Sequence, residues 1–380
     1  MRRYKTYING EWFEGASGIV LRSVDPSNNK ELGEIVQNSK EDVEYAIESA
    51  SRSFYKTREW RDLDVQQRSD KLLKIADMIE SEIDEIAKTE SMDNGKPLRE
   101  AQADVDDAVH CFRYYAGLIR TPSGQTYNVN SNFGNMHSYT VKEPVGVCAL
   151  ITPWNFPFLM SVWKIAPALA AGNSIIFKPS SETVLSALKL FEILDKCDLP
   201  KGTANLVIGS GSTVGNLLAE SKKVDMITFT GSTSVGQGIM RAAAGNVKKI
   251  GLELGGKSPN IVFADTDIDK TVEWVMMGIF LNQGEVCCAG SRLIIEKSIK
   301  DKFLKKLVER TDKLTLGAPL DNPDMGPLIS KKHMQDVLGY IEKGKAEGAK
   351  LLCGGYKCTD DDLVNGNFIK PAIFDDCTSD

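Results

Sequence analysis

Apolar residues recur at helical spacing over residues 41–56, 64–92 and 98–119, and these three patterns predict amphipathic helices. The segment 93–97, Asp-Asn-Gly-Lys-Pro, separates the second helix from the third because glycine and proline interrupt helices. Residues 121–142 are rich in Ser, Asn, Gly, Tyr and Thr, and their polar and apolar positions partly alternate. This stretch predicts a hairpin that leaves the main body.

Further along the chain, short apolar runs alternate with helical patterns. Strands are predicted at VGVCALITPW, NSIIFKP, TANLVIG, DMITFTG and SPNIVFA, and helices at ETVLSALKLFEIL, STVGNLLAES and STSVGQGIMRAAA. This β-α-β-α order predicts an α/β fold with an open, Rossmann-like parallel sheet and helices on its faces. A helical stretch, IDKTVEWVMMGIFLNQG, then leads to two adjacent cysteines, and a further strand and helices follow.

Composition and charge exclude several classes of protein. The chain has 380 residues, of which 42% are hydrophobic and 26% charged, as in a soluble globular protein with more than one structural unit. A net charge of −6 does not indicate binding to nucleic acid or to an anionic membrane, since both attract basic surfaces. No apolar run is long enough to cross a bilayer. Eight irregularly spaced cysteines indicate reduced thiols and a cytoplasmic location.

The adjacent residues Cys287 and Cys288 allow four interpretations. A disulfide between neighbours would strain the peptide that joins them. A metal site is not predicted, because none of His110, His137 and His333 is spaced with cysteines as zinc requires. A buried thiol and an activated thiolate in a partly exposed, electropositive pocket both remain, and the pattern does not say which cysteine would react.

Glycine-bearing loops follow two of the predicted strands, at residues 209–215 and 231–236. Glycine lets the backbone approach a ligand, and the N-terminus of a following helix offers N–H groups to phosphate. Neither loop has the G-x-G-x-x-G dinucleotide pattern, so ordinary strand-to-helix turns are the alternative. Lys178 follows another predicted strand, and all three features fit a ligand crevice at the carboxyl edge of a parallel sheet.

Two polar residues stand in distinctive local sequences. Glu253 lies between leucines and precedes two glycines that would let another segment come close. An enclosed carboxylate there would suit a general base, although an exposed glutamate is the alternative. Asn155 is bracketed by two prolines. Its rigid amide would suit a developing oxyanion, and an ordinary turn asparagine is the alternative.

Taken together, these segments resemble the NAD(P)-dependent aldehyde dehydrogenase superfamily, from Tyr7 to the end of the chain. The motifs TPWNFP, KPS, FTGST, LELGGKSP and F-x-x-x-G-E-x-C occur in the family's order. Among the subfamilies, betaine-aldehyde and broad-range dehydrogenases are the most similar. The resemblance implies an NAD(P)-binding domain at 1–121 and 145–254, a β-hairpin oligomerisation arm at 122–144 and an incomplete α/β catalytic domain at 255–380. It also implies a homodimer or homotetramer.

The resemblance assigns the catalytic roles. Cys287 would attack an aldehyde to form a thiohemiacetal, whose oxygen would be held by the Asn155 amide and the Cys287 backbone N–H. Hydride transfer to the nicotinamide would leave a thioester, and Glu253 would activate the water that hydrolyses it. Cys288 would be a bystander, and Cys287 would rest as a thiolate.

The cofactor and substrate residues also come from the resemblance. NAD or NADP would contact Trp154, Lys178, Ser181, Gly209, Ser232, Val235 and Leu254. Many NAD-preferring relatives have a glutamate where this chain has Ser181, and a serine leaves room for a 2′-phosphate, so both cofactors fit. The aldehyde tunnel would contain Phe156, Trp163 and Leu281, whose aromatic walls suit a hydrophobic or quaternary-ammonium aldehyde.

Two alternatives to aldehyde hydrolysis follow from the same resemblance. A CoA-acylating dehydrogenase would pass the acyl group to CoA, but such enzymes typically lack a base at the position of Glu253. Family members continue beyond the position of Asp380 with an E-x-F-G-P motif that grips the nicotinamide ribose. We therefore expect the 380-residue chain to bind NAD(P)+ weakly and to turn over poorly, or to act only as a cofactor-binding chain.

Overall fold

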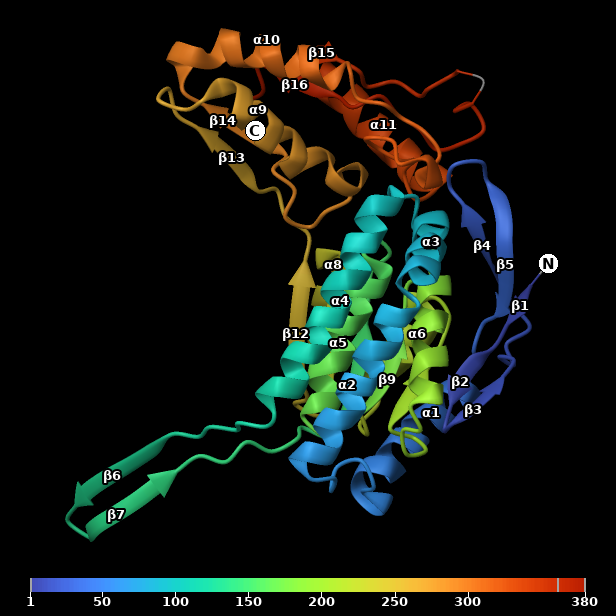
Figure 1. Ribbon diagram of the computed structural model, residues 1–380, viewed down its shortest axis with the longest axis vertical. Coiled ribbons are helices and arrows are strands. Elements are labelled where there is room, and N and C mark those ends of the chain that lie inside the picture. The colour runs from blue at the N-terminus through green and yellow to red at the C-terminus, as the bar shows by residue number, and fades with distance from the viewer. Residues whose placement is uncertain (1, 361, 379–380) are drawn as a thin grey trace.

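The computed structural model describes residues 2–360 and 362–378, and its centre is a seven-stranded sheet (Figure 1). The strand order is β12-β11-β8-β9-β10-β2-β3. The parallel strands are β8 (Val147–Ile151), β9 (Ser174–Lys178), β10 (Ala204–Leu206), β11 (Met226–Gly231) and β12 (Lys249–Leu254). β2 (Thr6–Ile8) and β3 (Glu11–Phe13) add an antiparallel edge. The predicted Rossmann-like parallel sheet is confirmed, apart from this edge.

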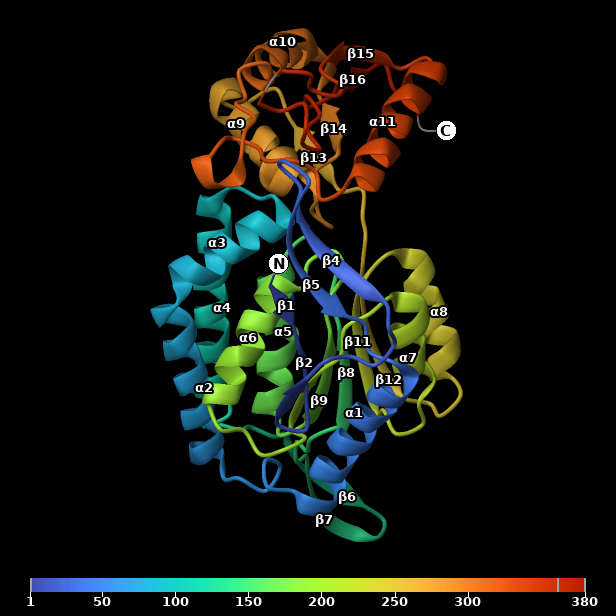
Figure 2. The same cartoon turned by 90° about the vertical axis from the view of Figure 1, so that its right-hand side faces the viewer.

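Helices cover both faces of the sheet, and Figure 2 shows the two layers on opposite sides. One layer contains α2 (Val65–Ser81), α3 (Ile83–Asn94), α4 (Leu98–Leu118), α5 (Pro157–Ala170) and α6 (Leu185–Lys196). The other contains α1 (Lys40–Arg52), α7 (Asn216–Glu220) and α8 (Thr233–Ala243). In β8, Cys148 and Leu150 pack in the core between the sheet and the first layer of helices. Val147 and Ala149 pack in the core between the sheet and the second layer. This alternation explains the continuous apolar run of β8.

Three local predictions differ from the structure. The predicted helix 64–92 is two helices, α2 and α3, because Glu82 leaves helical geometry while the apolar spacing continues in phase across the break. The run SPNIVFA forms β13 (Pro259–Val262), which pairs with β14 (Arg292–Ile295) outside the large sheet. Helix α5 is not predicted by periodicity, because it is buried on most sides and lacks a broad polar stripe.

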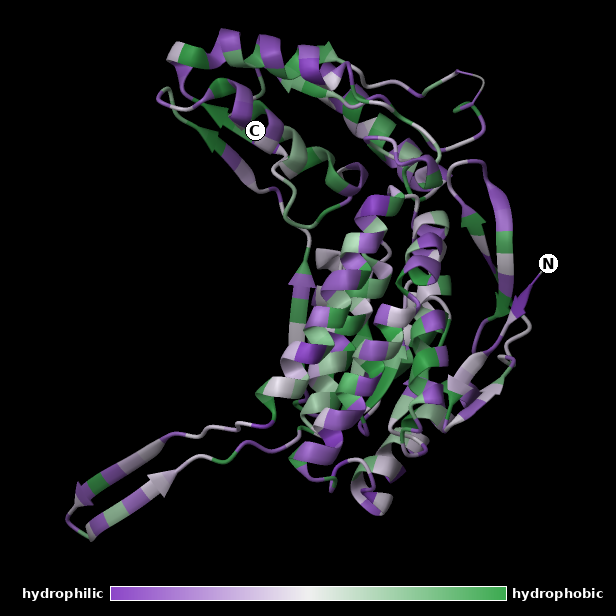
Figure 3. Cartoon of the chain, viewed as in Figure 1, coloured by the Kyte–Doolittle hydropathy of each residue, from purple (hydrophilic) through white to green (hydrophobic). Residues whose placement is uncertain are grey.

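The predicted hairpin consists of β6 (Thr126–Ser131) and β7 (Gly134–Tyr139), and it projects from the body (Figure 1). Every residue of both strands is exposed. Figure 3 shows apolar positions among the polar ones on this hairpin. Its exposed apolar side chains include Tyr127, Val129, Phe133, Met136 and Tyr139. A separate three-stranded sheet contains β1 (Arg3–Tyr4), β4 (Val20–Asp25) and β5 (Lys30–Val36).

The last part of the chain forms a smaller α/β unit with its own core. Its helices are α9 (Ile268–Phe280), α10 (Lys300–Thr311) and α11 (Lys331–Ala346), and β15 (Lys350–Cys353) pairs with β16 (Ile373–Asp375). This core includes Val272, Met276, Phe303 and Leu307. Figure 1 shows the unit beyond the end of the large sheet toward which β12 points. Within the described residues, no helix is both long and apolar enough to span a membrane.

Candidate active site

The parallel strands of the large sheet end at one edge, and the predicted cofactor residues lie at or just after these ends. They are Trp154 after β8, Lys178 and Ser181 after β9, Gly209 after β10, Ser232 and Val235 after β11, and Leu254 at the end of β12. The carboxyl edge of a parallel sheet is the usual ligand position in such folds. The structure therefore brings these predicted residues to one edge.

Two strand-end loops are joined by polar contacts near this edge. The Ser181 hydroxyl donates to the Gly209 carbonyl oxygen at 3.0 Å. Lys178 is only 4% exposed, and its Nζ donates to the Pro179 carbonyl oxygen at 2.7 Å. Burial lowers the pKa of Lys178 to about 8. An incoming ligand with ribose hydroxyls would offer this amine further acceptors.

Helix α8 begins at the same edge. Ser232 caps it, since its hydroxyl accepts from the Val235 N–H at 3.4 Å. A Cβ added at Gly236 would lie 2.8 Å from Leu254 Cδ2, so the helix packs tightly against the end of β12. Unpaired N–H groups at a helix start favour phosphate. This start, together with the buried Lys178, fits a dinucleotide cofactor.

A cavity of ≈ 530 Å³ lies between α5 and one face of the large sheet, and its wall runs from Met226 at the start of β11 to Glu253 near the end of β12. Cys287, Glu253 and Trp163 line it together with Lys164 and Thr230. Two of the three predicted catalytic residues, from positions 34 apart in the sequence, thus face one space. Phe156 and Leu281 are not on its wall, so of the predicted tunnel residues only Trp163 lies there.

Glu253 is an exposed residue of β12, and its predicted enclosure is wrong. Successive residues of a strand point to opposite faces, so the leucines on either side do not surround the carboxylate. Leu252 and Leu254 pack against the core on the α8 side, and Glu253 faces the cavity. A carboxylate in this place has access to water, as a base that activates water requires.

The predicted close approach at the glycines after Glu253 is confirmed. A Cβ added at Gly256 would lie 2.9 Å from the Cys287 carbonyl oxygen. This contact seats the cysteine loop against the end of β12. A side chain at this position would push Cys287 away from Glu253, so the glycine is required by packing.

Cys287 is exposed and lies beside Cys288, which is also exposed. Partial burial and then the neighbouring Cys288 thiol raise the pKa of Cys287 above its ordinary value. The raised pKa is opposite to what the predicted resting thiolate requires, and no cationic side chain of the described residues contributes to the shift. A group in the cavity must take the proton before Cys287 attacks.

Alkylation of Cys287 by iodoacetamide tests this protonation state. Because only the thiolate reacts, we expect the rate to keep rising with pH past the ordinary cysteine pKa of about 8.5. The Cys288→Ala variant removes one cause of the raised pKa, so its profile should shift to lower pH. Peptide mass spectrometry would assign the modified residue. A rate that is already constant below neutral pH would contradict the neutral thiol.

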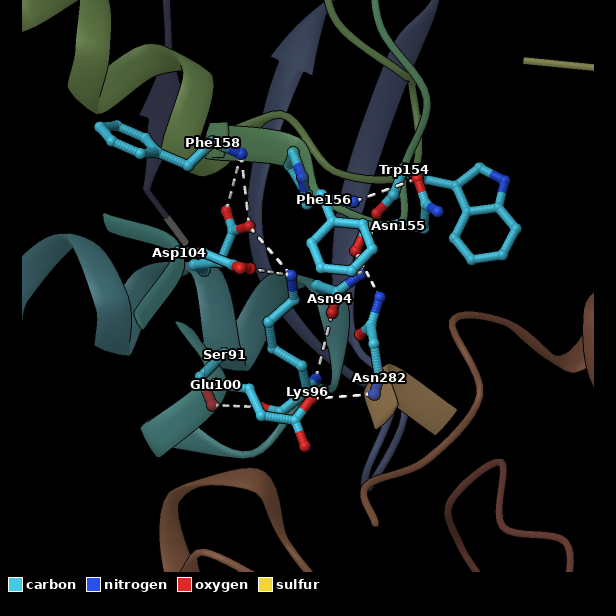
Figure 4. Close-up of polar contacts among 12 residues, drawn as sticks. Ser91, Asn94, Lys96, Glu100, Asp104, Trp154, Asn155, Phe156, Phe158 and Asn282 are labelled. Atoms are coloured by element: carbon cyan, nitrogen blue, oxygen red, sulfur yellow. Dashed lines mark hydrogen bonds and ion pairs between the residues drawn. The ribbon is translucent and has the colours of Figure 1, made fainter. Parts of the chain in front are cut away.

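Asn155 is tied to the loop that carries Cys287, as Figure 4 shows for its backbone contact with Asn282. Its side-chain Nδ2 donates to the Glu285 carbonyl oxygen at 2.6 Å. An asparagine amide has two hydrogens, so a second one remains for an oxyanion. Asn155 does not line the cavity wall, although it contacts the segment two residues before Cys287.

The sequence interpretation missed Lys164. This residue of α5 is only 8% exposed, lines the cavity and donates through Nζ to the Thr228 hydroxyl at 2.8 Å. Burial lowers the pKa of Lys164 to about 8, and the nearby Glu253 opposes this shift. The sequence signal that could have identified Lys164 is that it is the single lysine of a mostly apolar helix. A lysine buried in such a setting usually has a partner.

Glu285 is a second residue that the sequence interpretation missed. It is buried, accepts from the Ile329 N–H at 3.1 Å and lies 3.5 Å from His333 Nε2. Burial raises the pKa of Glu285 to about 8. The His333 ring packs against the Trp154 ring with centroids 5.0 Å apart. Glu285 therefore links the cysteine loop to the start of α11 and to one predicted cofactor residue.

Comparison with known proteins assigns the family. Residues 12–380 match the model described as the aldehyde dehydrogenase family. The chain belongs to this family and is an NAD(P)-dependent aldehyde dehydrogenase.

Several relatives and one group of solved structures are especially similar. Betaine aldehyde dehydrogenase of Bacillus subtilis is 46% identical over 98% of this chain and 76% of its own length. Peroxisomal aminoaldehyde dehydrogenase 1 of Pisum sativum is 43% identical over 98% of this chain and 75% of its own length. The crystal structure of betaine aldehyde dehydrogenase from Staphylococcus aureus in complex with NAD+ has a TM-score of 0.95 and 41% identity, covering 98% of this chain and 74% of that one.

Proposed function

We propose that this enzyme oxidises an aldehyde to the carboxylic acid through a covalent intermediate on Cys287, with Glu253 as the general base. The observation that carries the proposal is that both side chains line one cavity against the face of the large sheet. Water, rather than CoA, is the proposed acyl acceptor, because an exposed carboxylate faces the sulfur's cavity.

The chemistry begins with loss of the Cys287 proton. Glu253 and Lys164 are the carboxylate and the amine on the cavity wall, and a lysine with a pKa of about 8 is partly neutral near pH 8. The sulfur then adds to the aldehyde carbon, and the carbonyl oxygen becomes an oxyanion that accepts from the Asn155 amide and the Cys287 N–H. Bound NAD(P)+ supplies the hydride acceptor.

The second half releases the product. Loss of hydride from the former aldehyde carbon converts the adduct into a thioester on Cys287. Glu253 takes a proton from water as the water oxygen attacks the thioester carbon. The carbon–sulfur bond breaks, the carboxylic acid leaves, and the proton taken up by Glu253 returns to the sulfur and restores the thiol. Either NAD or NADP fits the Ser181 position, because its short side chain adds no carboxylate near the 2′-hydroxyl.

We further propose a cationic, ammonium-bearing aldehyde as the substrate. A second cavity of ≈ 540 Å³ shares Trp163 with the catalytic cavity. Its wall combines the carboxylate of Asp107 with the aromatic rings of Tyr114 and Tyr115. Carboxylates and aromatic faces both attract ammonium groups. The names of the bacterial and pea relatives, betaine aldehyde and aminoaldehyde dehydrogenase, agree with this class.

One set of assays tests the reaction and the substrate class. Trimethylammonio-acetaldehyde and its neutral isostere 3,3-dimethylbutanal would be compared by kcat/KM, each with and without CoA. We expect the cation to be preferred about tenfold or more, since a desolvated cation–π contact contributes about 1–2 kcal/mol. CoA should not be required. Strict dependence on CoA would refute hydrolysis, and equal use of the two aldehydes would refute the cationic substrate.

Assembly and domain organisation are also proposals. We infer that the hairpin at 122–144 packs against a second copy in a homodimer or homotetramer, because both of its faces expose apolar side chains. The proposed cofactor domain remains 1–121 with 145–254. The proposed catalytic domain remains 255–380, and the described part of it has a separate apolar core.

A further inference from the structure

The chain makes a strained turn shortly before Cys287. Asn282 has φ 46° and ψ 46°, and Gln283 has φ 58° and ψ 18°; Gly284 follows with φ 79°. Two successive non-glycine residues in the left-handed region are uncommon, and such geometry persists only where surrounding contacts enforce it. Both Asn282 and Gln283 are buried. The contacts that enforce the turn are therefore internal to the fold.

A carboxylate from the other side of the domain boundary holds this turn. The Asn282 backbone N–H donates to Glu100 Oε2 at 2.9 Å (Figure 4). Glu100 lies in the first turn of α4, 182 positions away in the sequence. A hydrogen bond from an N–H to a carboxylate is stronger than one to a neutral acceptor. Glu100 is thus placed to stabilise the left-handed backbone of Asn282.

The Asn282 side chain reaches in the other direction, to Asn155. Its Nδ2 donates to the Asn155 carbonyl oxygen at 2.7 Å, and Asn155 Nδ2 donates to the Glu285 carbonyl oxygen at 2.6 Å. These two contacts close a ring that contains the segment from Asn282 to Glu285. The ring fixes the Asn155 amide and the start of the cysteine loop in one arrangement.

A second amide holds the same backbone segment. Asn94 Nδ2 donates to the Trp154 carbonyl oxygen at 2.8 Å, and Asn94 Oδ1 accepts from the Lys96 N–H at 3.1 Å. Figure 4 shows Asn94 and Asn282 converging on the Trp154–Asn155 segment. Amides from α3 and from the cysteine loop therefore both hold the backbone of the Trp154–Asn155 segment.

We propose that Glu100 and Asn282 are positioning residues for the oxyanion site: Glu100 fixes the left-handed turn, and Asn282 fixes Asn155 beside the Cys287 loop. The inference rests on the proposed role of Asn155. Neither residue touches the reacting atoms. Their contribution is to hold the amide where negative charge develops, and small displacements of such donors have large effects on rate.

The two side chains can be tested separately. The Asn282→Gly variant keeps a backbone that accepts positive φ but removes the amide donor to Asn155. The Glu100→Ala variant keeps the amide but removes the acceptor for the strained turn. Glu100→Gln retains the shape and a weaker, neutral acceptor, so it should recover part of the activity. Gln102→Ala is the control on the same helix, because Gln102 contacts Asp84 away from the site.

The primary measurement is the rate of the first turnover, followed as the burst of NAD(P)H. We expect Asn282→Gly and Glu100→Ala to slow the burst about ten- to a hundredfold, below the loss of about 10²–10³ typical of a deleted oxyanion donor. Iodoacetamide alkylation of Cys287 and NAD(P)+ binding should change less than about twofold, since neither requires the oxyanion site. A general structural defect would lower all three.

Combination with Asn155→Ala decides the mechanism. If Glu100 acts through Asn155, the double variant should be no slower than Asn155→Ala alone, because the two residues act as a unit. If the two substitutions slow the burst by the product of their separate effects, the inference is overturned. A normal burst in Asn282→Gly together with a slow burst in Asn155→Ala would also overturn it. A normal burst in Asn155→Ala would instead overturn the proposed oxyanion role, and the inference with it.

Discussion

Replacement of Cys287 by alanine is expected to lower aldehyde oxidation by at least about a thousandfold, because the covalent route is lost with the sulfur. Cys288→Ala is the matched control. It removes the thiol of the adjacent residue, which is also exposed, and should retain most of the activity. Steady-state formation of NAD(P)H would be measured for both variants, with NAD(P)+ binding as a check that the fold is intact.

Trapping the covalent intermediate is a second way to test that Cys287 is the nucleophile. Rapid acid quenching during turnover should trap an acyl group on the enzyme, and peptide mass spectrometry should place it on Cys287. Cys287→Ala should carry no adduct. If the acyl group lies on Cys288, or if Cys288→Ala is the inactive variant, the assignment of the nucleophile is wrong.

Local sequence was enough to predict much of the sheet and part of the site. The apolar runs at β8 and β9 are continuous because both faces of these strands are covered by helices. The edge strand β12 carries Lys249, Gly251 and Glu253, so its pattern is weaker and only its motif draws attention. Alternation along β12 also explains why apolar neighbours do not enclose Glu253.

The contacts that shape the site are less accessible to sequence reasoning. Cys287 stands within a short contiguous motif, whereas Glu100 meets Asn282 across 182 positions and belongs to none of the motifs. The left-handed geometry at Asn282 and Gln283 is not required by the local sequence either, since asparagine only tolerates this region and Gly284 is the one glycine that follows. Pairings of this kind arise from how the two units pack, so they required the structure.

The protonation state of the nucleophile links these observations. The raised pKa of Cys287 means that most of the sulfur is protonated near neutral pH, although the site is open to solvent. Thiols in this state resist alkylation and oxidation, because the thiolate is the reactive form. Before Cys287 can attack an aldehyde, a group in the cavity must therefore accept its proton. Glu253 and Lys164 are the wall residues suited to that task.

Substitution of Glu253 by glutamine is expected to separate the two halves of the reaction. The amide has nearly the shape of the carboxylate but cannot accept a proton from water, so thioester hydrolysis should slow about 10²–10⁴-fold. The first turnover should retain a measurable burst of NAD(P)H if Lys164 can take the Cys287 proton. The acyl-enzyme should then accumulate, and intact-protein mass spectrometry would detect it as a shift equal to the acyl group.

A nucleophile that needs no base gives the discriminating control for this variant. Hydroxylamine attacks thioesters directly but also condenses with free aldehydes, so it would be added to acyl-enzyme that has been freed of excess aldehyde. It should then release the acyl group from Glu253→Gln, while it accelerates release from the unmodified enzyme much less. Glu220→Gln, an exposed carboxylate at the end of α7, should behave like the unmodified enzyme. If Glu253→Gln shows neither a burst nor rescue by hydroxylamine, Glu253 is required before the thioester forms. Its role would then be to deprotonate Cys287, and the base for hydrolysis would have to be sought elsewhere on the cavity wall.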